Sequence, residues 1–86
     1  MDEWRGRINE ILYTLQFRPQ LDDAVADDLA RLIVNRQVLT AGPDVYVAAI
    51  RQALADSGPL DEQIGTPHSE ATLRAFFARL DARLSA

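Results

Sequence analysis

The chain contains one histidine, His68, which stands next to a serine, Ser69. Nucleophilic catalysis requires a base within hydrogen-bonding reach of a hydroxyl or thiol. We expect both residues in the exposed first turn of a helix, where adjacent side chains point about 100° apart. That geometry is poor for a serine and histidine relay. The sequence therefore predicts no catalytic residues, and we expect a protein that is not an enzyme.

Two pairs of carboxylates, Asp22-Asp23 and Asp27-Asp28, are the next candidates for chemistry. They lack the histidine spacing of a zinc helix and the loop pattern of a calcium site, so we expect no metal and no cofactor. Negative charge favours the N-terminal end of a helix, which explains the first pair. The alternative is an acidic ridge, made of Asp23, Asp27 and Asp28, that meets a basic partner.

Two aromatic residues do not fit the apolar stripe of their own helix. Tyr13 and Phe17 are four residues apart and lie at roughly 100° and 140° from Leu12 on a helical wheel. Arg18 follows directly, and aromatic residues with arginine are enriched at the energetic centres of protein interfaces. The sequence therefore predicts a partner-binding surface of Tyr13, Phe17 and Arg18. The alternatives are a first helix that is buried on two sides, or a Phe17 that packs inward where this helix frays.

The elements that position these residues are amphipathic helices. Apolar residues recur at three- and four-residue steps in four segments, at about 3–17, 22–39, 43–57 and 67–84. A short helical turn is expected near 60–64, and no segment alternates as a strand does. Short joints favour antiparallel neighbours. The predicted fold is therefore all-α, a compact bundle of four helices in a single domain spanning 1–86. The expected core residues are Trp4, Ile8, Ile11, Leu12, Leu15, Leu21, Val25, Leu29, Leu32, Ile33, Tyr46, Val47, Ile50, Ala53, Leu54, Leu73, Phe76, Phe77, Leu80 and Leu84.

Helix boundaries follow from capping residues. Asp22 is expected to cap the second helix, and Pro43 to open the third. Ser57-Gly58-Pro59 is expected to close the third with glycine at C′, and Thr66-Pro67 to open the fourth. The second helix either stops near Asn35 or continues with a second apolar surface. In the fourth, Glu70 lies four residues before Arg74 for modest surface support.

A stripe of alanines occupies the side of the fourth helix that faces away from its phenylalanines. Alanine there reflects helix propensity or allows another helix to approach closely. The stripe consists of Ala71, Ala75, Ala78 and Ala82.

Composition narrows the classes of partner. Eighty-six residues without cysteine form one domain of marginal size, which makes oligomerisation a way to gain stability. The formal net charge of −4 argues against nucleic acid as a partner. No apolar run is long enough to cross a bilayer, and we expect a cytoplasmic protein without membrane contact.

The leading functional prediction is a protein-protein interaction module that acts as an adaptor, a homo-oligomer such as a homodimer, or an inhibitor or immunity-type protein. One alternative is a nucleic-acid-binding regulator resembling a helix-turn-helix, in which Arg51 and Gln52 would make the contacts. A second alternative is similar to acyl carrier proteins, because Asp56-Ser57 matches the dipeptide that carries their prosthetic group. In carrier proteins that serine opens a helix, whereas Ser57 is expected to close one.

Overall fold

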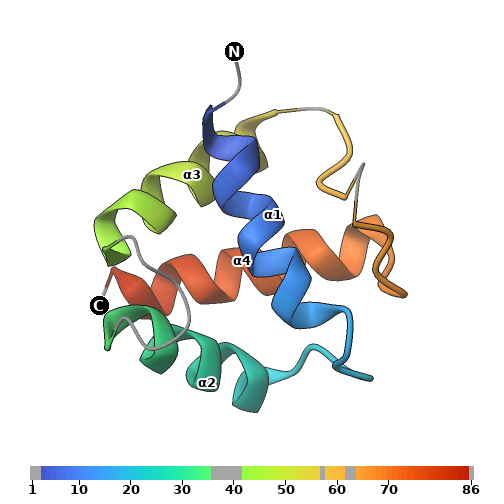
Figure 1. Ribbon diagram of the computed structural model, residues 1–86, viewed down its shortest axis with the longest axis horizontal. Coiled ribbons are helices and arrows are strands. Elements are labelled where there is room, and N and C mark those ends of the chain that lie inside the picture. The colour runs from blue at the N-terminus through green and yellow to red at the C-terminus, as the bar shows by residue number, and fades with distance from the viewer. Residues whose placement is uncertain (1–2, 36–41, 57, 62–63, 86) are drawn as a thin grey trace.

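Four helices and their connections make up the computed structural model, which describes residues 3–35, 42–56, 58–61 and 64–85. The helices are α1 (Glu3–Leu15), α2 (Asp23–Val34), α3 (Pro43–Ala55) and α4 (Glu70–Leu84) (Figure 1). No strand occurs within the described ranges. The molecule measures 31 × 29 × 20 Å along its principal axes. The prediction of an all-α bundle of four helices is confirmed.

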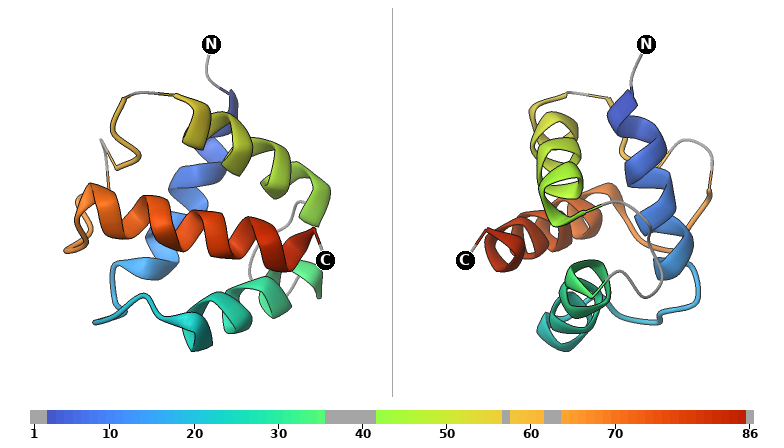
Figure 2. Two further views of the ribbon diagram at one scale, coloured as in Figure 1. Left: turned by 180° about the vertical axis from the view of Figure 1, so that it is seen from behind. Right: turned by 60° about the vertical axis from the view of Figure 1, so that its left-hand side comes forward.

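The helices pack in three pairs, with α3 against both α1 and α4, and α2 against α4. Figure 2 shows α1 crossing the outside of the bundle, with α4 lying between α2 and α3. α4 runs opposite to α3, and α2 also runs opposite to α3, so α2 and α4 point in the same direction. The consecutive helices α3 and α4 are antiparallel, as short joints favour, whereas α2 and α4, which are not joined directly, are parallel.

The core is built from the apolar face of each helix, as the helical spacing predicts. Every fully buried residue in the described part of the chain is apolar or, for Tyr46, aromatic. The buried residues are Ile8, Ile11, Leu12, Leu15, Leu21, Ala26, Leu29, Ile33, Tyr46, Ala49, Ile50, Ala53, Leu60, Leu73, Phe76, Phe77 and Leu80. Phe76 and Phe77 meet edge to face, with their ring centroids 6.0 Å apart. Partly buried apolar side chains, including Trp4 and Leu84, pack around this cluster.

Two of the predicted helix starts are confirmed. The Asp22 side chain accepts a hydrogen bond of 3.1 Å from the amide of Val25, which caps α2. Pro43 occupies the first turn of α3, after Gly42. α2 ends at Val34 with Asn35 as its C-cap. The continuation expected over 36–39 lies outside the described residues.

Two other boundaries differ from the prediction. α3 ends at Ala55, not at 57, because Asp56 leaves the helical conformation and accepts a bond of 2.7 Å from the amide of Gly58. α4 begins at Glu70, not at 67, because Ser69, and not Thr66, accepts the amide of Thr72. At both boundaries a side-chain oxygen, of Asp56 or of Ser69, accepts a nearby backbone amide and so fixes where the helix ends or begins.

The connection between α3 and α4 is anchored by apolar contacts, as expected. Leu60 is buried and Ile64 packs against the core. The helical turn expected near 60–64 includes residues 62 and 63, which lie outside the described residues. Asp61 organises the following turn, and Gly65 there adopts a φ of +72°, a left-handed conformation that favours glycine.

Candidate functional site

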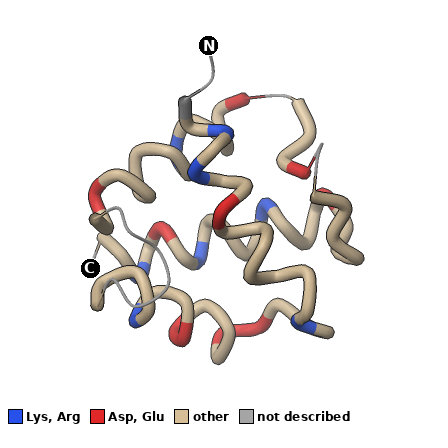
Figure 3. The backbone as a smooth tube through the Cα atoms, viewed as in Figure 1, with Lys and Arg blue, Asp and Glu red and all other residues tan. Residues whose placement is uncertain are grey.

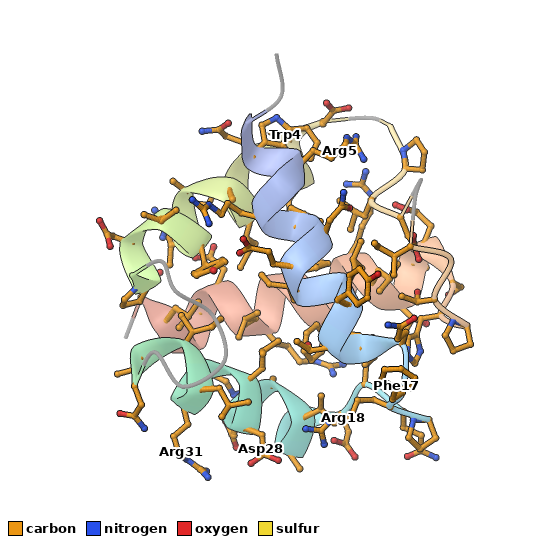
Figure 4. The ribbon with its side chains drawn as sticks, viewed as in Figure 1. Trp4, Arg5, Phe17, Arg18, Asp28 and Arg31 are labelled. Carbon is orange, nitrogen blue, oxygen red and sulfur yellow. The ribbon has the colours of Figure 1, made fainter. Side chains whose placement is uncertain are left out.

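Two large aromatic side chains near the end of α1 are exposed. Tyr13 is 62% exposed and Phe17 is 83% exposed, whereas the aromatic rings of Tyr46, Phe76 and Phe77 are fully buried. Figure 4 shows Phe17 and Arg18 at the end of α1, beside the start of α2. We call Tyr13 and Phe17 the aromatic face. The alternative prediction, that α1 is buried on two sides, is wrong for these two residues.

The backbone of α1 fixes the direction of the aromatic face. Leu12 and Leu15 are buried on the core side. Beyond Leu15 the amide of Gln16 still donates to the carbonyl of Leu12 at 3.2 Å, so the chain remains helical almost as far as Phe17. Side chains four residues apart share one side of a helix, and Phe17 therefore lies one turn beyond Tyr13 on the solvent side.

The same side of α1 carries two more residues towards its N-terminus. On a helical wheel Gly6, Glu10, Tyr13 and Phe17 fall within about 60° of one another. Gly6 is exposed, and a Cβ atom built there would meet no atom within 4 Å. Glycine inside a helix costs about 0.5–1 kcal/mol relative to alanine. Packing within the domain does not require that glycine.

An open groove of about 630 Å³ lies between α1 and α3, next to Gly6. The residues of α3 that line the groove are mostly small or apolar. The α1 residues that line it include a tryptophan and an ion pair. The lining residues are Trp4, Gly6, Arg7, Glu10, Val45, Ala48, Ala49 and Gln52. The groove is therefore an open hollow whose lining is polar and apolar in similar measure, with small and apolar side chains on its α3 side.

Glu10 is held in place at the edge of this groove. Its Oε1 accepts from Nη1 of Arg7 at 3.0 Å, and its Oε2 accepts from the hydroxyl of Tyr46 at 2.6 Å. Tyr46 is fully buried, so this bond satisfies its hydroxyl and ties α1 to α3. At the far end of the groove the guanidinium of Arg5 lies 4.7 Å from the ring centroid of Trp4 (Figure 4).

The predicted acidic ridge is already partnered within the chain. Asp23 lies 3.7 Å from Arg79 and 3.5 Å from Arg83, and Asp27 accepts a close hydrogen bond from Arg83. The bond to Asp27 is the main reason that the pKa of Arg83 is raised. These pairs join α2 to α4, and the acidic positions along α2 are visible in Figure 3. The two residues are therefore not free carboxylates awaiting a basic partner.

The third acidic residue, Asp28, pairs locally. It lies 3.6 Å from Arg31 one turn later, and the Arg31 side chain is largely exposed while that of Asp28 is about half exposed (Figure 4). A surface pair of this kind is weak and easily exchanged. Asp28 could therefore change partners at little cost, and the same argument applies to Asp23, whose side chain is 74% exposed.

His68 and Ser69 have separate structural roles. The Nε2 atom of His68 lies 3.1 Å from the carbonyl oxygen of Leu15, at the C-terminal end of α1. Ser69 caps α4. The expectation that His68 lies in the exposed first turn of α4 is wrong, because α4 begins after it and the imidazole is partly buried against α1. The two side chains do not form a catalytic relay.

Arg74 and Glu70 do more than support the surface. Arg74 donates to three carbonyl oxygens at the end of α3, those of Leu54 at 3.2 Å, Asp56 at 2.9 Å and Gly58 at 2.9 Å. Glu70 accepts from the amide of Leu60 at 2.6 Å. The spacing of Glu70 and Arg74 predicts only a pair with each other and gives no sign of these contacts with the end of α3. A signal was present in the helix-ending sequence Ser57-Gly58-Pro59, because the last carbonyl groups of a helix need hydrogen-bond donors from elsewhere.

Asp61 was also missed. Its carboxylate accepts from the amides of Ile64 at 3.1 Å, Gly65 at 2.8 Å and Thr66 at 2.6 Å. Burial raises the pKa of Asp61, but the hydrogen bonds from Gly65, Thr66 and Ile64 outweigh it and lower the pKa below 3.8. The residue therefore acts as an ionised clamp on the turn before α4.

Other site chemistry has little support in the described residues. No cluster of three or more histidine and acidic residues there could hold a metal ion, and no helix there has the length and apolarity to cross a bilayer. Ser57, which the acyl-carrier alternative requires, lies outside the described residues. Comparison with known proteins adds no assignment, since no family model, curated protein or solved structure matches the chain.

Proposed function

We propose that this protein is a non-enzymatic protein-binding domain that contacts its partner through the aromatic face. The observation that supports this most directly is the exposure of Phe17, 83%, beside Tyr13 at 62%. The same sequence buries its other phenylalanines completely. Large aromatic rings next to an arginine are typical of residues that dominate binding energy, and Arg18 is exposed beside them.

The acidic residues have a secondary role in this proposal. A basic partner could contact Asp28 after displacing Arg31 alone. At Asp23 and Asp27 it would compete with the arginines of α4. We therefore place the centre of the interface at Tyr13, Phe17 and Arg18, with Asp23, Asp27 and Asp28 towards its edge. This form fits an adaptor, an inhibitor or immunity-type protein, or a homo-oligomer.

The helix-turn-helix alternative gains no support from α3. Arg51, which it needs for base or phosphate contacts, donates instead to Asp81 at 3.2 Å and to Ser85 at 3.1 Å on α4. The one cationic group that the alternative assigns to α3 is therefore engaged within the domain.

Photo-crosslinking tests the proposal. Phe17 is replaced with benzoylphenylalanine, which keeps an aromatic side chain, and the protein is irradiated in its native cells. We expect one or a few discrete adducts with protein. The matched control places the same probe at Ala55, which is exposed at the end of α3. Equal labelling from both positions, or no protein adduct from Phe17, would remove the basis of the proposal.

A further inference from the structure

Gly6 has no steric role among the residues that the structure describes. It lies in the interior of α1 without a positive φ, it is exposed, and a side chain at this position would point into open space. Glycine in a helix interior destabilises the helix relative to alanine. A common use of such a glycine is to let another backbone or a large side chain approach closely. No described residue of this domain occupies that space, so a second molecule can supply the approaching group.

The spacing of the exposed side of α1 has an internal symmetry. Gly6 and Glu10 are four residues apart, and so are Tyr13 and Phe17, with the midpoint between Ile11 and Leu12. In the first pair Gly6 has no side chain and Glu10 is fixed by its hydrogen bonds. In the second pair both side chains are large and exposed. When two such helices meet antiparallel about a twofold axis, each position faces its counterpart across the midpoint. Gly6 then faces the second copy's Phe17, and Glu10 faces the second copy's Tyr13.

The groove between α1 and α3 gives the incoming ring a place to lie. It opens beside Gly6, and its α3 side is formed by Val45, Ala48 and Ala49, with Gln52 beyond them. Gly6 and Phe17 are separated by about 16 Å along the helix, at 1.5 Å per residue. One side of α1 therefore carries both the projecting ring and a hollow that can receive it.

We infer that the occupant of the aromatic face is a second copy of this chain. The two α1 helices pack antiparallel about a twofold axis, and Phe17 of each copy enters the groove beside Gly6 of the other. This inference rests on the proposed function, since it names the partner that the aromatic face binds.

Electrostatics agree with this pairing. Glu10 is the one charged residue of the four, and its two oxygens already accept from Arg7 and Tyr46. In the antiparallel register the two copies of Glu10 do not face each other, and each meets a tyrosine whose hydroxyl can donate a further hydrogen bond. Among these four positions the interface therefore brings no like charges together. An isologous contact also closes on itself, so it produces a dimer and not a fibre.

Sedimentation equilibrium over a concentration series tests the inference. We expect reversible dimerisation of the unmodified protein, with a dissociation constant below about 1 mM. Gly6→Leu, which fills the groove entrance, and Phe17→Ser should each weaken dimerisation by about tenfold or more. The matched control is Ala24→Leu, at an exposed position of α2, and it should leave dimerisation unchanged. Circular dichroism confirms that each variant is folded.

Concentration-dependent amide shifts in a ¹⁵N-labelled sample locate the interface. We expect them at Gly6, Tyr13, Phe17 and Ala48. Shifts confined to the alanine stripe of α4 would overturn the inference, as would a dimer whose dissociation constant Gly6→Leu does not change. A protein that stays monomeric up to about 1 mM also overturns it. If the Phe17 probe then captures a different protein, the proposed function survives, whereas the absence of any adduct removes both.

Discussion

Arg74 is the residue whose removal gives the sharpest test of how the domain is held together. Its guanidinium binds the carbonyl oxygens of Leu54, Asp56 and Gly58, all at the C-terminal end of α3, where helical carbonyls lack partners. Arg74→Met removes these hydrogen bonds but keeps most of the apolar stem of the side chain. The substitution therefore isolates the contribution of the charged group.

The expected cost follows from the geometry. A hydrogen bond from a charged donor contributes about 1.5–3 kcal/mol when well buried. One of the three bonds is exposed, and the Arg74 side chain is 30% exposed, so solvent screening reduces the sum. We expect Arg74→Met to lower the free energy of unfolding by about 2–3 kcal/mol. For a domain of this size that corresponds to a fall in Tm of about 10–20 °C.

Urea unfolding followed by circular dichroism measures this change, and Arg31→Met is the matched control. The Arg31 side chain is 68% exposed and, among the described residues, pairs with Asp28 alone at 3.6 Å, so its loss should change stability by less than about 0.5 kcal/mol. Arg74→Lys should recover no more than about half of the loss, since an ammonium cannot reach three carbonyls in the planar arrangement of a guanidinium. If Arg74→Met costs no more than Arg31→Met, the reasoning is refuted.

The other predictions concern the core, the surface and pH. Phe77→Ala should lower the free energy of unfolding by about 3–5 kcal/mol in urea titrations, and a near-neutral value would mean that the core face of α4 is assigned wrongly. Tyr13→Ser combined with Phe17→Ser should change monomer stability by less than about 1 kcal/mol, and global unfolding by circular dichroism would return these residues to the core. Gly6→Ala should raise the Tm of the dilute monomer, because it adds about 0.5–1 kcal/mol of helix stability; a lower Tm would show a hidden steric role. The pKa of Asp61 is lowered, so its ionised form contributes stability above pH 4 or so that is lost as the pH falls through the lowered value. Asp61→Asn should therefore be less stable than the unmodified protein at neutral pH and nearly equal to it in strong acid, as measured by urea unfolding across pH.

The fold could be predicted because it depends on periodicity, which is a local property of the sequence. The apolar stripe of α1, led by Ile8 and Leu12, is buried as expected, and so is that of α4 around Phe77. Asp22 could be identified as a cap because its partner, the amide of Val25, is only three residues away. Such features are decided within one helix and need no knowledge of its neighbours.

The features that escaped prediction depend on contacts between distant segments. His68 bonds to the end of α1, fifty-three residues away, and Arg83 pairs with Asp27 of α2. A helical wheel also cannot decide whether Tyr13 is buried by a second layer, because that depends on where the other helices pack. The start of α4 was misplaced for a related reason, since Thr66 donates its amide to Asp61 and leaves Ser69 to cap the helix.

The two candidate surfaces differ in what a partner must break to use them. A basic partner on Asp23 and Asp27 competes with Arg79 and Arg83 for the ion pairs that join α2 to α4, so part of its binding energy is offset by weakening those pairs. Tyr13 and Phe17 stand in solvent, and covering them removes apolar surface from water without breaking those pairs. Salt separates the two cases, because screening weakens contacts between exposed charges and leaves apolar burial intact. Affinity that persists at high salt would therefore place the interface on the aromatic face, and a steep fall with salt would place it on the ridge.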